Sequence, residues 1–227
     1  MKKFYKFFLI AILINFSLPG HAHVEHYENL KLIEFDIYRN GKNIGTHIFS
    51  FKRNNDHLEV ESEINFEIKK LGVVLYKYKV KGVEIYKDGK LIKFNSKTNQ
   101  NGKEKYVNLV LENNELTIDG SSYKGSVPAD YLLGKWWNHS IVNAEAQISA
   151  VSGRIIKQKV TFLGKETIKI NDKTYNTLLF NFSSTDKKLA KDKQLNTNIW
   201  YEEQTLNWVK ASFKKKGKWE YKLVSLN

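Results

Sequence analysis

The side chains that could carry out catalysis in this sequence are few and widely spaced. A histidine held by a carboxylate can activate a serine hydroxyl for nucleophilic attack, so His139 and Asp130 are the first candidates. The serine would be one of Ser121, Ser122 and Ser126. The sequence contains no Gly-x-Ser-x-Gly, phosphate-binding glycine loop, His-Glu-x-x-His or dinucleotide motif. We therefore expect a protein that binds rather than catalyses, without a cofactor, and keep a hydrolase as an alternative.

His23 is a second candidate for chemistry. Cleavage of an export signal after Ala22 would make His23 the first residue, and its amine and imidazole could bind copper together with another histidine. A polar chain end explains the same residue without a metal, because chain ends seldom dock on the domain. We predict no metal site.

The segment 127–150 interrupts the regular pattern of the chain with adjacent tryptophans, a tyrosine and leucines. Such large apolar side chains must be buried somewhere. They either plug the core, or they form a lid over an apolar cavity with polar groups at its mouth. In the lid hypothesis, alanine at both tryptophans weakens ligand retention more than stability. The residues concerned are Tyr131, Leu132, Trp136 and Trp137, with Asn138 and His139 at the mouth.

Residues 1–22 have the three parts of a cleavable export signal: lysines, an apolar run at 7–18, and small residues before the cleavage point. A helix of this run is about 18 Å long, whereas the hydrocarbon layer is about 30 Å thick. We expect cleavage after Ala22, a single all-β domain over 23–227, no transmembrane segment in the mature form, and a soluble periplasmic protein.

The chain carries 37 basic and 24 acidic residues, a formal net charge of +13, and no cysteine. The absence of cysteine excludes disulfides and a lipid-modified cysteine anchor. Only Arg39, Arg53 and Arg154 are arginines, although arginine is favoured for phosphate and base recognition. The composition therefore predicts a solvated lysine surface, or attraction to an anionic envelope surface, and no nucleic-acid partner.

Alternation with a period of two indicates β-strands along most of the chain. From Leu58 to Ile68 the even positions are mostly apolar and the odd positions mostly glutamate. In the next run, tyrosines and valines lie on one face of the strand and lysines on the other. Antiparallel pairing with residue numbers that sum to 140 would set Glu63 opposite Lys77. Tyr76 and Tyr78 then face the apolar side, so we expect both to line the cavity.

Short turns join these strands. Asn-Gly and Asp-Gly pairs at 40–41, 88–89, 101–102 and 119–120 favour tight hairpins, which make sequential antiparallel pairing the expected topology. The apolar positions shift from even to odd at Gly82, and this predicts a bulge there. About thirteen strands, two of them at 154–163 and 166–170, must curl to avoid a long exposed edge. We predict an all-β antiparallel meander that forms a barrel or half-barrel, with the 127–150 connector in the middle.

The sequence also resembles a family of exported proteobacterial proteins that is catalogued as a domain of unknown function. The resemblance covers the mature chain but departs at His139, where the family has proline. No activity follows from it, and the implied architecture is similar to the half-barrels of periplasmic lipoprotein carriers. The matching stretches are DIYRNGKNIG at 36–45, WWN at 136–138, FLGKE at 162–166, NIWY at 198–201, WV at 208–209 and YKL at 221–223.

Three functional hypotheses follow. The first is a soluble periplasmic protein that binds or carries an apolar or amphipathic, lipid-like ligand inside the curled sheet. The second is a non-enzymatic structural or interaction module that docks on the cell envelope through a lysine-rich face. The third is a hydrolase or copper enzyme, which requires His139 or His23 to meet suitable partners.

Overall fold

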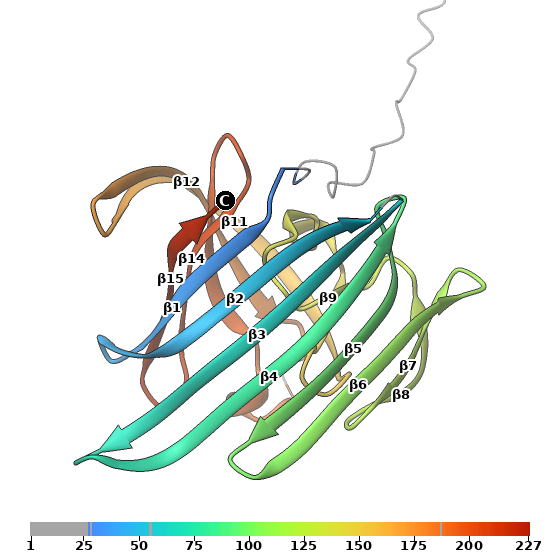
Figure 1. The fold of residues 1–227 in the computed structure, drawn as a ribbon, viewed down its shortest axis with the longest axis horizontal. Helices are drawn as coiled ribbons and strands as arrows, with labels where there is room; N and C mark the ends of the chain where they lie inside the picture. The colour runs from blue at the N-terminus through green and yellow to red at the C-terminus, as the bar shows by residue number, and fades with distance from the viewer. Residues whose placement is uncertain (1–26, 28, 55, 187) are drawn as a thin grey trace, which may run out of the picture.

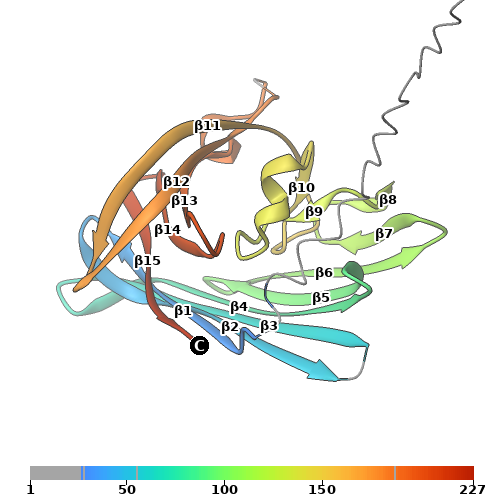
Figure 2. The same cartoon turned by 90° about the horizontal axis from the view of Figure 1, so that it is seen from above.

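The computed structural model shows one continuous sheet that curls on itself, with a short connector set into its open side (Figures 1 and 2). Fifteen strands are formed by the residues that the structure describes, which are 27, 29–54, 56–186 and 188–227. The expected export signal and His23 lie outside these residues, so cleavage after Ala22 stays a prediction.

The strands follow one another closely along the chain. Its first half forms β1 (Leu32–Arg39), β2 (Lys42–Asn54), β3 (His57–Lys70), β4 (Val73–Lys87), β5 (Lys90–Gln100), β6 (Lys103–Glu112), β7 (Glu115–Gly120) and β8 (Lys124–Pro128). Its second half forms β9 (Leu132–Leu133), the 3-10 helix η2 (His139–Asn143), β10 (Ala146–Ile148), β11 (Ile155–Ile170), β12 (Lys173–Ser184), the 3-10 helix η3 (Lys191–Lys193), β13 (Asn196–Glu202), β14 (Trp208–Lys214) and β15 (Lys218–Leu226).

The strand order runs from β8 back to β1, then from β15 back to β9. Pairing of β1 with β15 therefore joins the two halves of the chain. All neighbouring strands are antiparallel except β9 and β10, which are parallel. The two edge strands, β8 and β9, are separated by only three residues, 129–131, yet the sheet is not closed between them. The predicted curled antiparallel all-β fold is confirmed, in its half-barrel form.

Most of the hairpins expected from Asn-Gly and Asp-Gly pairs form at those pairs. Asn40, Asp88 and Asn101 have φ values of 50°, 48° and 52°, and a glycine in the left-handed region follows each. The turn predicted at Asp119-Gly120 was wrong, because β7 continues through both residues. Gly120 lies so close to the chain that follows the connector that a Cβ there would be 2.7 Å from the Ser152 carbonyl oxygen, so close packing explains this glycine.

The β3–β4 register differs from the predicted one. Residue numbers sum to 144 along most of the ladder, so Glu63 lies opposite Lys81 and Glu67 lies opposite Lys77. The two-residue turn at Leu71-Gly72, together with an irregularity after Ile68, sets this register. The predicted alternation is nevertheless correct, because a shift by an even number keeps each side chain on its expected face.

Two glycines have roles other than those predicted. Gly164 does not separate two strands: it lies at a bulge, with φ of 124°, within the single strand β11. Conversely, β4 passes through Gly82 in regular register with Ser62 on one side and Ser96 on the other, so the bulge predicted there was wrong.

Aromatic rings fill the centre of the curl. Phe35 stacks on Trp208 with ring centroids 3.8 Å apart, and Trp136 meets Trp208 edge-on at 5.3 Å. Trp137, fully buried, is surrounded edge-on by Tyr27, Phe51 and Tyr86. The core therefore lies between the two walls of the sheet and includes side chains of the connector.

The connector contains β9, η2 and β10, which lie between the two walls on the open side of the curl (Figure 2). The end of the connector and the residues just after it are fixed to the first half of the sheet by hydrogen bonds: Ser96 Oγ donates to the Ala150 carbonyl oxygen over 2.6 Å, and Ser122 N donates to that of Ser152 over 2.8 Å. The connector is thus an ordered part of the core rather than a loose crossing.

Candidate functional site

A hollow of about 800 Å³ opens at one rim of the half-barrel, beside the break between β8 and β9. Its wall combines apolar groups with amide, hydroxyl and charged groups. The β4–β5 and β6–β7 turns contribute to it, as do the connector residues that follow Pro128. The lining consists of Tyr86, Gly89, Lys90, Leu91, Leu111, Asn113, Asn114, Glu115, Pro128, Ala129, Asp130, Leu132, Asn138 and Ser140.

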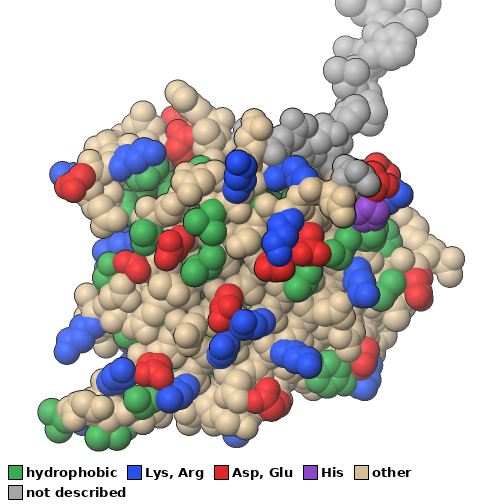
Figure 3. All heavy atoms as spheres, viewed as in Figure 1, with side chains coloured by type: hydrophobic (Ala, Val, Ile, Leu, Met, Phe, Trp, Pro, Cys, Tyr) green, Lys and Arg blue, Asp and Glu red, His purple; other side chains and the backbone are tan. Residues whose placement is uncertain are grey.

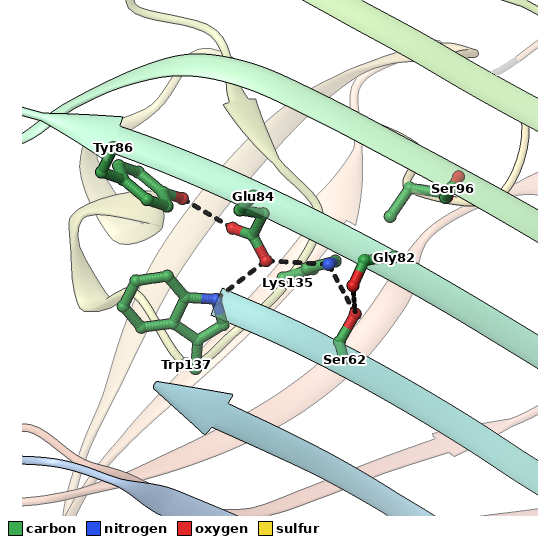
Figure 4. Close-up of polar contacts among 8 residues, drawn as sticks. Ser62, Gly82, Glu84, Tyr86, Ser96, Lys135 and Trp137 are labelled. Atoms are coloured by element: carbon green, nitrogen blue, oxygen red, sulfur yellow. Dashed lines mark hydrogen bonds and ion pairs between the residues drawn. The ribbon is translucent and has the colours of Figure 1, made fainter. Parts of the chain in front are cut away.

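Behind this wall lies a buried network of polar side chains (Figure 4). The Tyr86 hydroxyl donates a hydrogen bond of 2.6 Å to Glu84 Oε2. The other oxygen of Glu84 accepts hydrogen bonds from Lys135 Nζ over 2.8 Å and from Trp137 Nε1 over 3.4 Å. Tyr86 thus connects the hollow to an ion pair inside the fold.

The ion pair is almost completely removed from solvent, since the side chains of Lys135 and Glu84 are 7% and 0% exposed. Lys135 Nζ also donates to Ser62 Oγ over 2.7 Å and lies 4.6 Å from the centre of the Phe94 ring. Gly82 leaves room for the ammonium group, because a Cβ there would lie 3.4 Å from Nζ and 3.1 Å from Phe94. A lysine from the connector therefore fills a position that β3, β4 and β5 shape together.

Burial shifts the pKa values around this pair. It lowers the pKa of Lys135, while the Glu84 charge opposes that effect. Burial and the Glu84 carboxylate raise the pKa of Tyr86 well above its usual value, so its hydroxyl remains a donor. The pKa of His47 lies well below its usual value because of burial and the nearby Lys135 charge. The Tyr86 and His47 side chains beside the ion pair are thus neutral near pH 7.

Two of the eight predicted binding residues, Leu132 and Asn138, meet at the rim hollow. Asn138 is well placed as a rigid polar group, because its side-chain oxygen caps η2 by accepting from Ser140 N over 3.0 Å. Half-buried Tyr131 lies in the chain between β8 and β9, and its N–H donates to the Pro128 carbonyl oxygen. The part of these residues in binding stays a prediction.

The other predicted residues lie away from the hollow. Trp137 is a core residue, and half-buried Trp136 packs against Trp208 and Tyr221. Tyr76 and Tyr78 of β4 stack on Phe66, with ring centroids 6.1 Å away for Tyr76 and 4.9 Å for Tyr78. The eight residues therefore do not converge on one cavity, and both tryptophans are placed as the plug hypothesis expects.

His139 is buried against the second half of the sheet. Its ring meets the rings of Tyr201 and Phe180 edge-on at 4.7 and 5.9 Å. The hydroxyls of two of the three candidate serines are engaged elsewhere: Ser121 Oγ, in the β7–β8 turn, bonds to Tyr106, and Ser126 Oγ, on β8, bonds to Thr117. This geometry gives no support to the serine triad.

Sequence reasoning missed the central residues of the network, Glu84 and Lys135. A signal was present: the inward side of β4 continues through Gly82 and Glu84, both polar or small in an otherwise apolar series. An acidic residue at an inward position predicts a buried cationic partner, because an unpaired buried charge is strongly unfavourable. Which lysine supplies it depends on the path of the connector.

Among the described residues, no helix combines the length and the apolar character that a membrane crossing requires. The fold and the site together define an open, barrel-like all-β protein with a hollow at one rim and a buried ion pair behind it. The chain belongs to the family described as Domain of unknown function (DUF6134), which matches residues 35–224. This confirms the predicted membership of an uncharacterised family.

A solved structure is similar to this chain. It is a crystal structure described as a beta-barrel-like protein of domain of unknown function DUF1849 from Brucella abortus. The TM-score is 0.59 and the identity is 12%, with 87% of this chain and 97% of that chain covered. At this identity the similarity shows the fold alone. A comparison with curated proteins finds no match.

Proposed function

We propose that this protein is a binding protein for a small amphipathic, lipid-like molecule, which it holds in the rim hollow. The observation that carries the proposal is the combination of volume and lining. About 800 Å³ falls within the usual range for ligand pockets, and such pockets typically pair an apolar wall with a few fixed polar groups. Leu91, Leu111 and Leu132 supply the wall, and Asn138 supplies a fixed polar group.

The sequence suggested a site inside the curled sheet, but aromatic rings already fill that interior. We therefore place the site at the rim. A ligand inside the curl would have to displace Trp137 and the rings that surround it. A ligand at the rim displaces no buried ring. The charges on the rim are mixed, with Lys90 near Glu115 and Asp130, so amide and hydroxyl groups rather than net charge orient the polar end.

The Glu84–Lys135 network supports the hollow from behind. Tyr86 lines the hollow and is held by its hydrogen bond to buried Glu84, so its ring presents a fixed surface. Preorganised walls reduce the entropy that is lost when a ligand binds.

The test uses a fluorescent fatty acid, dansylaminoundecanoic acid, as the probe. Leu111→Trp fills the hollow and is expected to weaken probe binding by about tenfold or more, a change of about 1.4 kcal/mol. Val110→Trp is the matched control, because Val110 is the adjacent, outward-facing residue of β6 and is 39% exposed. Equal affinity of the two variants, or no probe binding by the wild type, would contradict the proposal.

We also propose that the protein acts in the periplasm. The support is the export-signal pattern of residues 1–22. Mass spectrometry of the protein isolated from a periplasmic fraction is expected to give a chain that begins at His23. A chain that keeps Met1, or one confined to the cytoplasm, would contradict this location. Lipid extracted from the same natively purified sample would identify the ligand class.

A further inference from the structure

The two-residue turn between β3 and β4 carries an exposed leucine where the other two-residue hairpin turns of the sheet carry asparagine or aspartate. Leu71 has φ of 49° and is followed by Gly72 with φ of 79°. Left-handed backbone disfavours most side chains other than those of glycine, asparagine and aspartate. Six other hairpins place a polar residue in the same conformation, with φ between 48° and 52°: Asn40, Asp88, Asn101, Asn113, Asn171 and Lys216. Leu206, in the longer β13–β14 turn, has φ of 52° but is half-buried.

Leu71 is also 95% exposed, so neither turn geometry nor packing within the fold accounts for a leucine there. Val73 and Leu75 beside it are 62% and 55% exposed. In most soluble proteins such side chains are scattered singly, whereas a cluster of them indicates an interaction site.

The hairpin extends past the strands on both of its sides. Pairing with β2 ends at Phe66, and pairing with β5 begins at Tyr78, so the residues between them form a projecting tip. The tip lies at the lower left of Figure 1, where β3 meets β4. The same corner of Figure 3 shows hydrophobic side chains at the surface, with lysine or arginine side chains close by.

Basic residues surround the apolar tip. Residues 67–77 contain three lysines and one glutamate, a net charge of 3 − 1 = +2. The glutamate, Glu67, bonds Lys69 at 3.1 Å and Lys77 at 3.2 Å. The turns at the same end of the neighbouring strands add Arg39, Lys42, Lys215, Lys216 and Lys218.

These neighbouring turns are held together as one surface. Asn40 Oδ1 accepts from Lys218 N over 2.8 Å, and Asn40 N donates to the Lys218 carbonyl oxygen over 2.8 Å. Half-buried Trp219 has its ring 5.3 Å from that of Phe66, and half-buried Tyr76 stacks on the same phenylalanine. Tyrosine and tryptophan favour the headgroup level of a bilayer.

We propose that the β3–β4 tip docks the protein on an anionic lipid bilayer, with Leu71, Val73 and Leu75 inserted among the lipids and the lysines on the headgroups. Charge complementarity identifies the partner, because apolar side chains framed by lysines match the boundary between acyl chains and anionic headgroups. A second copy of the tip does not match, since two such surfaces would bring their lysines together.

The experiment measures co-flotation with vesicles of three parts phosphatidylcholine to one part phosphatidylglycerol. It uses protein purified after export, with the amino terminus verified by mass spectrometry. Leu71→Asn is the main variant, since asparagine suits the turn conformation and the fold is expected to keep or gain thermal stability. We expect wild-type binding to fall by about tenfold in Leu71→Asn. It should also weaken between about 50 mM and about 500 mM NaCl.

Leu163→Asn is the matched control, because Leu163 is a 52% exposed leucine on β11, outside the tip. This variant should bind vesicles as the wild type does. Equal binding by Leu71→Asn and wild type, or absence of wild-type binding to anionic vesicles, would overturn the proposal. So would self-association that depends on Leu71 without vesicle binding. Leu111→Trp at the opposite rim should still bind vesicles, so failure of the rim site would not affect this result.

Discussion

Lys135 Nζ and Glu84 Oε1 lie 2.8 Å apart in the core of a sheet-built protein, although 51 residues separate them along the chain. Glu84 comes from the middle of β4 and Lys135 from the connector, so the pair ties the connector to the first half of the sheet. Both charged groups make further hydrogen bonds, to Tyr86 and Trp137 for the carboxylate and to Ser62 for the ammonium group. These bonds offset part of the cost of burying two charges.

We predict that the pair is strongly coupled. Glu84→Leu or Lys135→Met alone leaves a buried charge or donor without its partner and should lower the free energy of unfolding by about 3–5 kcal/mol. The double variant should lose clearly less than the sum of the two single losses. Urea denaturation of all four proteins measures this cycle, and additive losses would show that the two side chains act independently.

Trp137 and Trp136 should differ sharply in their contribution to stability. Trp137→Ala removes a fully buried ring and the bond to Glu84, with an expected loss of about 3–5 kcal/mol. Trp136 is half-buried, and its indole nitrogen has no hydrogen-bond partner among the described residues, so Trp136→Ala should cost less. Thermal denaturation compares them, and equal losses would argue against the plug role of Trp137.

His47 should make stability depend on pH below neutrality. Its pKa in the folded protein lies well below 6.5, so the unfolded chain binds a proton that the folded protein does not. Stability should therefore fall as the pH drops below 6.5, by about 2 kcal/mol between pH 7 and pH 5 from this group alone. In His47→Met that contribution should vanish, and an unchanged slope in denaturation at the two pH values would refute the assignment.

Buried tyrosines should set the alkaline limit of stability. Burial raises the pKa of Tyr27 to about 12 and raises those of Tyr78, Tyr86, Tyr201 and Tyr221 further. These groups stay protonated in the folded state and ionise near pH 10 once unfolded, so stability is lost as the pH rises above 10. Each of these five tyrosines lowers the free energy of unfolding by about 1.4 kcal/mol at pH 11.

Lys135 acts in the opposite direction, because its lowered pKa favours the folded state increasingly as the pH approaches 10.5. One such group cannot offset five tyrosines. An alkaline titration followed by tyrosinate absorbance and circular dichroism should show late, cooperative ionisation together with loss of the sheet. A single smooth titration of all tyrosines near pH 10, with the sheet intact, would contradict this prediction.

Local patterns were sufficient for most of the fold. Alternation over β3 and the Asn-Gly turns at Asn40 and Asn101 depend on residues close in sequence, and the structure keeps them. Strands near Gly164 and Gly120 were misassigned, because a glycine can mark a turn, a bulge or a close contact. Only the neighbours in space distinguish these cases.

The candidate site was predicted less well. Leu132 and Asn138 reach the hollow, but its other walls come from turns after β4 and β6 that carry no recognisable binding motif. Trp137 and Trp136 looked equivalent as neighbours in sequence. Their burial differs because one points into the gap between the walls and the other lies against β14 and β15.

By itself, the sequence determined that this chain forms sequential antiparallel strands, that its sheet must curl, and that it belongs to an uncharacterised family. Those properties arise from side-chain alternation and turn sterics, which act over a few residues. The tertiary structure alone decided that the connector fills the centre, that Lys135 meets Glu84, and that the hollow lies at the rim. Such contacts depend on how far the whole sheet curls, because curvature sets which distant side chains can meet.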